Sequence, residues 1–229
     1  MNVYLVGAKN PETRRQIDVQ RQANPDFVVK GFIDNDPVKK GGTFLGYPII
    51  GGIEQVSSLL KSDCDARFVN LITASTIARY ETSRALADLG CQFTNLIHPS
   101  VDLTDVEIGV GNYIQDGVII QAATRIGDNN SIHMAAIVGH GSSVGNSSFI
   151  APAASVSGEV EIGDGVFVGT NASIIPRRTI GNWATIGAGA VVIKDVVDHA
   201  IVFGNPARQI EFSERRYVDG AIFAFPASR

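Results

Sequence analysis

A six-residue period runs through the second half of the chain and constrains its fold more than any other feature. From Ile108 to Val192, every sixth position carries isoleucine or valine, which gives fifteen β-branched aliphatic residues in unbroken register. A helix would repeat its apolar residues every 3.6 positions and a simple strand every two positions. A period of six therefore predicts a solenoid in which a short strand and a corner alternate.

The residues around each aliphatic position fit a tight corner. Glycine follows the aliphatic residue in eight repeats, and we expect it to permit the backbone conformation of the corner. Three strands close one coil of a triangular prism, so fifteen repeats predict about five coils and a height of about 24 Å. Small residues two positions before the aliphatic residue leave room inside the turn: Ala136, Ser142, Ser148, Ala154, Ala172, Ala184 and Ala190.

The first hundred residues alternate between predicted strands and predicted helices. The strands are "NVYLVG", "FVVKGFIDND" and "ARFVNLITA", and the helices are "NPETRRQIDVQRQA", "IEQVSSLLK" and "STIARYETSRALADLG". We expect Asn10 to cap the first helix, with Pro11 at its first position, and Gly90 to end the third. "FTNLIHPS" predicts a last strand that leads into the prism. This alternation predicts a small parallel α/β domain.

Composition excludes several classes of protein. The chain has 229 residues, a net charge of −4, 45% hydrophobic residues and 18% charged residues, as an ordinary globular protein does. It has no basic cluster for nucleic acid and no 18-residue apolar run, and a leader is not expected from its N-terminal stretch. The two cysteines, Cys64 and Cys91, lack CxxC spacing and are expected to be free thiols. A cytoplasmic location is expected.

Two segments near the end of the repeats carry a resemblance to a known family. "TIGAGAVVIKDV" (185–196) and "FGNPARQI" (203–210), together with the repeats and "LIHPS", resemble the hexapeptide-repeat acyltransferases. The order of segments is similar to that of bacterial nucleotide-sugar acetyltransferases, including the sialic acid O-acetyltransferase type. The resemblance implies a left-handed parallel β-helix, a homotrimer, and acetyl-CoA as co-substrate without a metal.

The same resemblance divides the chain into three parts. Residues 1–97 are expected to form a Rossmann-like domain that binds a sugar nucleotide. Residues 98–210 are expected to form the β-helix, which binds acetyl-CoA and carries the catalytic residue. Residues 211–229 extend past the usual end of the family, and no role follows for them.

The predicted nucleotide site departs from the family pattern. Relatives have a glycine-rich turn of the type GAGGHG after the first strand, where "GAKNPE" here keeps only Gly7. Lys9, Asn10 and the following helix N-terminus are left to attract phosphate. The resemblance implies that Asp34 and Asn35 bind the base, although a turn that merely ends the strand is the alternative. "LITAS" is a second departure, and without a dinucleotide fingerprint NAD is not expected.

One histidine stands in the stretch "VGHGSSVG" (138–145). A histidine at a prism corner is often only a surface residue, but the resemblance implies that His140 is the presumed catalytic base, in a cleft between subunits. It would accept a proton from the attacking amine or hydroxyl, with a backbone N–H near Gly158 for the oxyanion. Many relatives have glutamate where Gly141 stands, and its absence favours an amine substrate. His140 then acts either as the base or as an anchor for the amine.

Further residues follow by position from the resemblance. His133 is expected at the surface or in the same cleft, and His98 and His199 are expected to be structural. With two histidines inside the repeats, the three-histidine metal site of the carbonic anhydrases on this fold is not expected. For Lys194 and Arg208 the alternative is an ordinary surface charge. The residues implied for the coenzyme are Phe149, Gly158, Thr170, Ala188, Lys194 and Arg208.

These features predict an acetyl-CoA-dependent N-acetyltransferase that acts on a nucleotide-linked amino sugar for surface polysaccharide, such as lipopolysaccharide, or for another glycan. Two alternatives stay open. One is an O-acetyltransferase of a sialic-acid-like sugar, and the other is a non-catalytic binding or scaffold protein that retains the fold.

Overall fold

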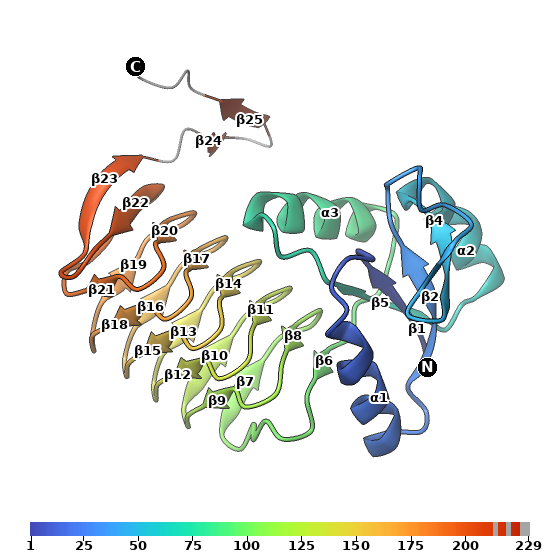
Figure 1. The fold of residues 1–229 in the computed structure, drawn as a ribbon, viewed down its shortest axis with the longest axis horizontal. Coiled ribbons are helices and arrows are strands. Elements are labelled where there is room, and N and C mark those ends of the chain that lie inside the picture. The colour runs from blue at the N-terminus through green and yellow to red at the C-terminus, as the bar shows by residue number, and fades with distance from the viewer. Residues whose placement is uncertain (213–214, 219–220, 225–229) are drawn as a thin grey trace.

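The structure is a computed structural model that describes residues 1–212, 215–218 and 221–224. An α/β domain comes first and is followed by a long prism of stacked coils (Figure 1). Part of the predicted C-terminal extension, 213–214, 219–220 and 225–229, lies outside the described residues. Within the extension, β24 (Arg215–Val218) and β25 (Ala221–Ala224) form an antiparallel pair.

The α/β domain contains one five-stranded sheet in the order β3-β4-β2-β1-β5. All its pairings are parallel except that of β3 with β4. The expected strands and helices are present, whereas β3 and β4 had no counterpart in the prediction. The bounds are β1 Asn2–Val6, α1 Thr13–Ala23, β2 Val28–Ile33, β3 Thr43–Phe44, β4 Tyr47–Gly51, the 3-10 turn η1 Ile53–Gln55, α2 Val56–Ser62, β5 Ala66–Asn70 and α3 Thr76–Asp88.

The first helix begins later than the sequence predicted. Its cap is Glu12, and Asn10 lies two residues before it. The Asn10 side-chain oxygen accepts the N–H of Glu12 at 3.0 Å, and its carbonyl accepts the N–H of Thr13 at 3.2 Å. Residues 10–13 therefore form a turn before α1, and the prediction that Asn10 caps the helix was wrong. The end of α3 is as predicted, with Gly90 in the left-handed region at φ +86°.

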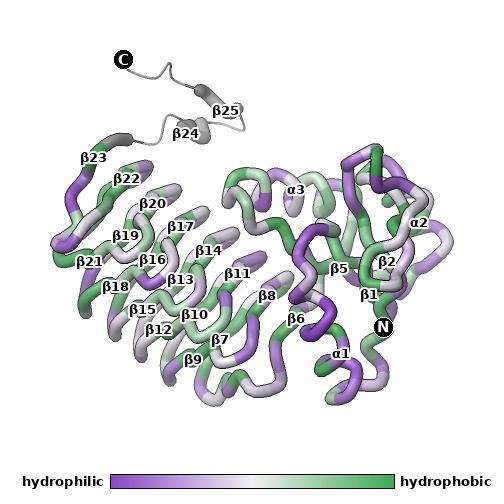
Figure 2. The backbone as a smooth tube through the Cα atoms, in the orientation of Figure 1, coloured by the Kyte–Doolittle hydropathy of each residue, from purple (hydrophilic) through white to green (hydrophobic). Residues whose placement is uncertain are grey.

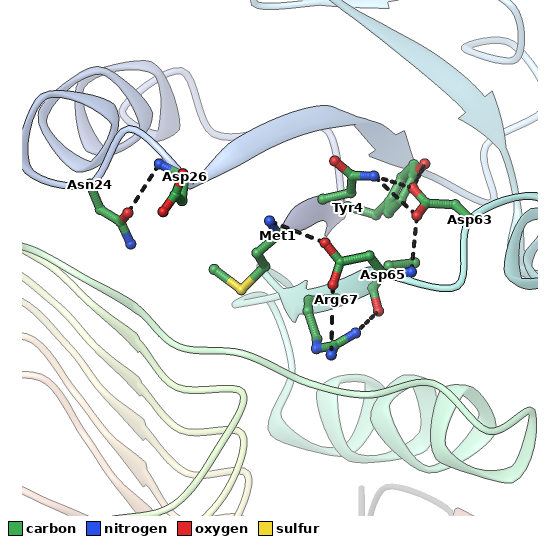
Figure 3. Close-up of polar contacts among 9 residues, drawn as sticks. Met1, Tyr4, Asn24, Asp26, Asp63, Asp65 and Arg67 are labelled. Atoms are coloured by element: carbon green, nitrogen blue, oxygen red, sulfur yellow. Dashed lines mark hydrogen bonds and ion pairs between the residues drawn. The ribbon is translucent and has the colours of Figure 1, made fainter.

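Carboxylates close the amino end of the sheet (Figure 3). Asp63 accepts hydrogen bonds from the Asn2 amide and the Tyr4 hydroxyl, both at 2.9 Å, and Asp65 pairs with the terminal amine of Met1 at 3.1 Å. Burial and the neighbouring Asp63 raise the pKa of Tyr4 to about 12. Because this edge is satisfied within the chain, ligand binding falls to the carboxyl ends of the strands.

The prism has three faces, each a parallel stack of short strands, and five complete coils as predicted. The strand that "FTNLIHPS" predicted, β6, pairs with β8 and so starts the second face. The first face contains β7 Val106–Ile108, β10 Thr124–Ile126, β13 Ser143–Val144, β16 Glu161–Ile162 and β19 Thr179–Ile180. The second contains β6 Leu96–Ile97, β8 Tyr113–Ile114, β11 Ser131–Ile132, β14 Phe149–Ile150, β17 Phe167–Val168, β20 Thr185–Ile186, β22 Ala200–Phe203 and the antiparallel β23 Arg208–Phe212. The third contains β9 Ile119–Ile120, β12 Ile137–Val138, β15 Ser155–Val156, β18 Ser173–Ile174 and β21 Val191–Val192.

The repeated aliphatic residues form one continuous core. Every predicted position is buried except Ile108, which is half-buried, and the small residues two positions earlier are fully buried. Hydrophobic segments recur coil after coil, whereas most of α1 is hydrophilic (Figure 2). The prism is the left-handed parallel β-helix that the resemblance implied.

The corner glycines have a different cause from the one predicted. The left-handed backbone falls three residues after the aliphatic position, as at Gly117 (φ +67°) and Trp183 (φ +59°), and not at the glycine that follows it directly. A Cβ added at Gly139 would lie 2.5 Å from the backbone nitrogen of Gly158 in the next coil. These glycines are needed because adjacent coils approach each other closely, so the conformational explanation was wrong.

Helix α3 joins the two parts of the molecule and lies beside the prism (Figure 1). Arg79 is fully buried, and its guanidinium donates to the backbone carbonyls of Ile72, Asn129 and Asn130. Burial lowers the pKa of Arg79 to about 9. The predicted amphipathic helix therefore buries an arginine against the prism rather than only an apolar stripe.

Candidate functional site

A cavity of about 570 Å³ opens at the carboxyl ends of β1, β2 and β5. Its walls include apolar side chains such as Val6, Ile33 and Leu71. All five residues predicted for the sugar nucleotide line it: Gly7, Lys9, Asn10, Asp34 and Asn35. The structure thus brings together residues that the sequence placed in two separate turns.

Asp34 is held by the protein itself. One carboxylate oxygen accepts the N–H of Ala8 and the ammonium of Lys39, both at 2.8 Å, and the other accepts the N–H of Asp36 at 3.0 Å. Burial acts to raise the pKa of the Asp34 carboxyl, but the hydrogen bonds from Lys39, Asp36 and Ala8 outweigh it and lower the pKa. Asp34 is therefore an anion that ties the turn after β1 to Lys39.

Lys39 is a cavity residue that the sequence reasoning missed. Its ammonium also donates to the carbonyl of Ala8 at 3.0 Å, and its side chain is 32% exposed. The only signal in the sequence was a lysine five residues after Asp34, and nothing indicated that the intervening loop folds back onto it.

Asn35 and Asn10 each use the side-chain oxygen within the protein. The Asn35 oxygen accepts the N–H of Ile53 at 2.9 Å, and the Asn10 oxygen accepts the N–H of Glu12. The amide nitrogen of each side chain can still donate hydrogen bonds to a ligand. Lys9 is exposed at the same cavity.

His140 lies on the corner between the third and first faces of the prism and is exposed. The backbone N–H of His140 donates to the side-chain oxygen of Gln121 at 2.9 Å, and its backbone carbonyl accepts the N–H of Glu159 at 2.8 Å. A Cβ added at Gly158 would lie 2.6 Å from the His140 Nε2 atom. The ring therefore lies directly over Gly158, which brings together two residues that the sequence assigned to the reactive end.

His133 is not at the surface, where one alternative placed it. It is 7% exposed and packs between the rings of Tyr113 and Phe149, at centroid distances of 5.8 and 4.7 Å. Burial, together with the charge of Arg79, lowers its pKa to about 4. Phe149 itself is buried, and its ring stacks on Phe167 at 5.0 Å.

The remaining coenzyme candidates lie on different edges of the prism. Gly158 and Lys194 share the corner of His140, whereas Thr170 and Ala188 follow strands of the second face and lie on the opposite edge of the third face. Arg208 lies in β23 at the end of the prism. Lys194, Thr170, Ala188 and Arg208 are all exposed, and one chain does not bring them together around His140.

Two kinds of feature are absent from the described residues. No group of three or more histidine, cysteine, aspartate or glutamate side chains in the described ranges is placed to hold a metal ion. No helix of the described chain has the length and apolarity needed to cross a lipid bilayer.

Comparisons with known proteins show what the chain is similar to. The profile of the family "Bacterial transferase hexapeptide (six repeats)" matches residues 159–194. PerB from Caulobacter crescentus, solved with CoA and GDP-perosamine, is 28% identical over 92% of this chain and 98% of its own, with a TM-score of 0.80. Residues 159–194 therefore carry the repeat of this family, and nearly the whole chain is similar in structure to PerB. No curated protein has a significantly similar sequence.

Two other solved structures resemble this chain over most of its length. The acetyltransferase domain of PglB from Neisseria gonorrhoeae, solved also with acetyl coenzyme A, is 26% identical in that complex over 91% of this chain and 98% of its own, with a TM-score of 0.75. WeeI from Acinetobacter baumannii is 25% identical over 92% of this chain and 100% of its own, with a TM-score of 0.78. Two further structures of the C. crescentus enzyme carry asparagine or alanine in place of one histidine.

Proposed function

We propose that this protein uses acetyl-CoA to N-acetylate an amino sugar linked to a nucleotide, for a surface polysaccharide such as lipopolysaccharide or for another glycan. The observation that carries the proposal is the pairing of two sites, the cavity at the end of the α/β sheet and His140 on the prism. Likeness over nearly the whole chain to an enzyme solved with CoA and GDP-perosamine supports it. The free thiols of Cys64 and Cys91 fit a cytoplasmic location.

The amine nitrogen of the sugar attacks the thioester carbonyl carbon, the C–N bond forms, and the C–S bond breaks to release CoA. His140 accepts the proton that the nitrogen loses and returns it to the departing sulfur, or it holds the amine by a hydrogen bond. The backbone of Gly158, directly under the ring, offers an N–H for the oxyanion.

The corner of His140 favours an amine over a hydroxyl. Among the described residues no carboxylate forms an ion pair with the His140 ring, and position 141 is a glycine with φ +64°. The equivalent position one coil later is Glu159, with φ +58°, so this corner accepts a glutamate. An attacking amine gives up its proton to an imidazole more readily than an alcohol does, so a ring without a carboxylate partner fits an amine substrate better.

A homotrimer would complete the coenzyme site. His140, Gly158 and Lys194 lie along one edge of the third face, and Thr170 and Ala188 lie along its other edge. A neighbouring copy would bring the two edges together across one cleft. The outward residues of this face carry no charge: Ile119, Ile137, Ser155, Ser173 and Val191. Ile119 is 53% exposed in the single chain, and a closed ring of copies would cover such a face.

The test is acetyl transfer from acetyl-CoA to a panel of nucleotide-linked amino sugars, free amino sugars and free sialic acids, followed by mass spectrometry. The proposal predicts an acetyl group on nitrogen and a preference for nucleotide-linked acceptors. An acetyl ester on a sialic-acid-like sugar would establish the O-acetyltransferase alternative instead. Absence of transfer to every acceptor, by protein that still binds acetyl-CoA, would favour a binding or scaffold role.

A further inference from the structure

The polar side chains that line the cavity differ in how many hydrogen-bond donors and acceptors they offer a ligand. Their acceptor atoms are engaged within the protein: the Asp34 carboxylate by three donors, and the Asn35 and Asn10 oxygens by one backbone N–H each. The donors that remain are the ammonium of Lys9, the third N–H of the Lys39 ammonium and the two amide nitrogens. The acceptor positions that these side chains still offer are the fourth on Asp34, the second lone pair of each asparagine oxygen, and the hydroxyls of Thr73 and Thr82.

The hydrogen bond from Lys39 limits how a ligand can bind to the Asp34 carboxylate. A carboxylate has about four acceptor positions, and three of those on Asp34 are filled at 2.8 to 3.0 Å. Only 13% of the Asp34 side chain is exposed. One position is left, so a ligand that donates two N–H groups to this carboxylate would have to displace the Lys39 ammonium, with the loss of a charge-assisted hydrogen bond.

We propose that the cavity selects a nucleoside diphosphate whose base is uracil or thymine and discriminates against guanine. The proposal rests on the proposed function, in which this cavity holds the nucleotide of the substrate. The pairing edge of uracil or thymine has two carbonyl acceptors and one N–H donor. The corresponding edge of guanine has one acceptor and two donors, from N1–H and the N2 amino group.

A cavity with several donors and few free acceptors satisfies the first pattern and leaves a donor of guanine unpaired. The Asn35 amide and the Lys39 ammonium can donate to the two carbonyls, and a threonine hydroxyl can accept the single N–H. An unpaired buried donor is costly, and sites that exploit this discriminate strongly. The apolar walls of the cavity, such as Ile33 and Leu71, suit a flat ring.

The experiment measures binding of UDP, dTDP, GDP and ADP to the full chain by calorimetry at one salt concentration. UDP and dTDP should bind at least about tenfold more tightly than GDP. If GDP binds as tightly as UDP or more tightly, the inference about the base is wrong while nucleotide binding stands. If no nucleoside diphosphate binds, and a nucleotide-linked amino sugar is acetylated no better than the free sugar, the proposed role of the cavity fails as well.

A matched pair of lysine variants tests whether Lys39 causes the preference for UDP over GDP. Lys39→Met removes the ammonium and frees one acceptor position on Asp34, so the preference for UDP over GDP should fall by about tenfold. Lys40→Met is the control, because Lys40 pairs with Glu54 at 3.2 Å and does not line this cavity. It should keep the wild-type preference. Equal weakening of UDP and GDP by Lys39→Met would show that Lys39 contacts the phosphates, and would overturn its role in base selection.

Discussion

The prism and the α/β domain are stabilised in different ways. In the prism, each repeated aliphatic residue pairs with an isoleucine or valine of the next coil, as Ile132 pairs with Ile150. In the α/β domain and at its junction, buried polar groups meet partners far away in sequence, as Arg79 meets Asn129 and Asp34 meets Ala8. A repeated contact is visible in the sequence as a period, whereas a contact made once leaves no pattern.

The largest expected effect on stability is at the junction. Arg79→Met removes the guanidinium and leaves three backbone carbonyls without their donor, which should destabilise the α/β domain by about 4 kcal/mol. The prism should keep its protection, because its core does not include Arg79. Hydrogen exchange resolved by segment measures both. Equal loss of protection in the two regions would show that they unfold as one unit.

The buried His133 should make the same junction sensitive to acid. Its folded pKa of about 4 lies below the ordinary value of 6.5, so the unfolded chain binds the proton more tightly. Stability is therefore full above about pH 6.5 and falls by on the order of 3 kcal/mol as the pH drops to 4. Urea unfolding across this range should show a weaker fall for His133→Phe than for wild type. The exposed His140→Ala serves as the control and should behave as wild type does.

Two glycines of the prism separate close approach from backbone conformation. A Cβ at Gly145 would lie 2.8 Å from the backbone of Gly163, whereas one at Gly117 meets nothing closer than 3.7 Å, although its φ is +67°. Gly145→Ala should cost about 2 to 3 kcal/mol and Gly117→Ala about 1 kcal/mol. Thermal unfolding of the two variants compares them. If Gly117→Ala is the more damaging, the corner conformation matters more than the coil spacing.

A change at the cavity should affect substrate binding. Asp34→Ala releases Lys39 and the turn after β1, which should raise KM for the nucleotide-linked sugar by about tenfold and leave that for acetyl-CoA unchanged. Steady-state kinetics with each substrate varied in turn gives both constants. A similar rise for both substrates would mean that Asp34 supports the whole fold rather than the sugar site.

The same difference between the prism and the α/β domain explains how much of the structure could be predicted from the sequence. The prism could be placed residue by residue from Ile108 to Val192, because each position is repeated. The cavity residues could be named from strand ends, but Lys39 could not, since its contact with Asp34 depends on how the loop after β2 folds back. The late start of α1 depends on the turn that Asn10 forms. The burial of His133 depends on rings that meet only in three dimensions.

The central claim is that one enzyme combines the cavity with His140, and kinetics of His140→Ala test it most directly. The oligomeric state and the melting temperature should be unchanged, because the exposed ring adds little to the aliphatic core. If the ring is the general base, kcat/KM for acetyl transfer should fall by about 10² to 10⁴, and Gly141→Glu should move the acid limb of the wild-type pH profile. A fall below about tenfold, with His140→Asn close to wild type, would contradict proton transfer by His140 and reduce it to an anchor.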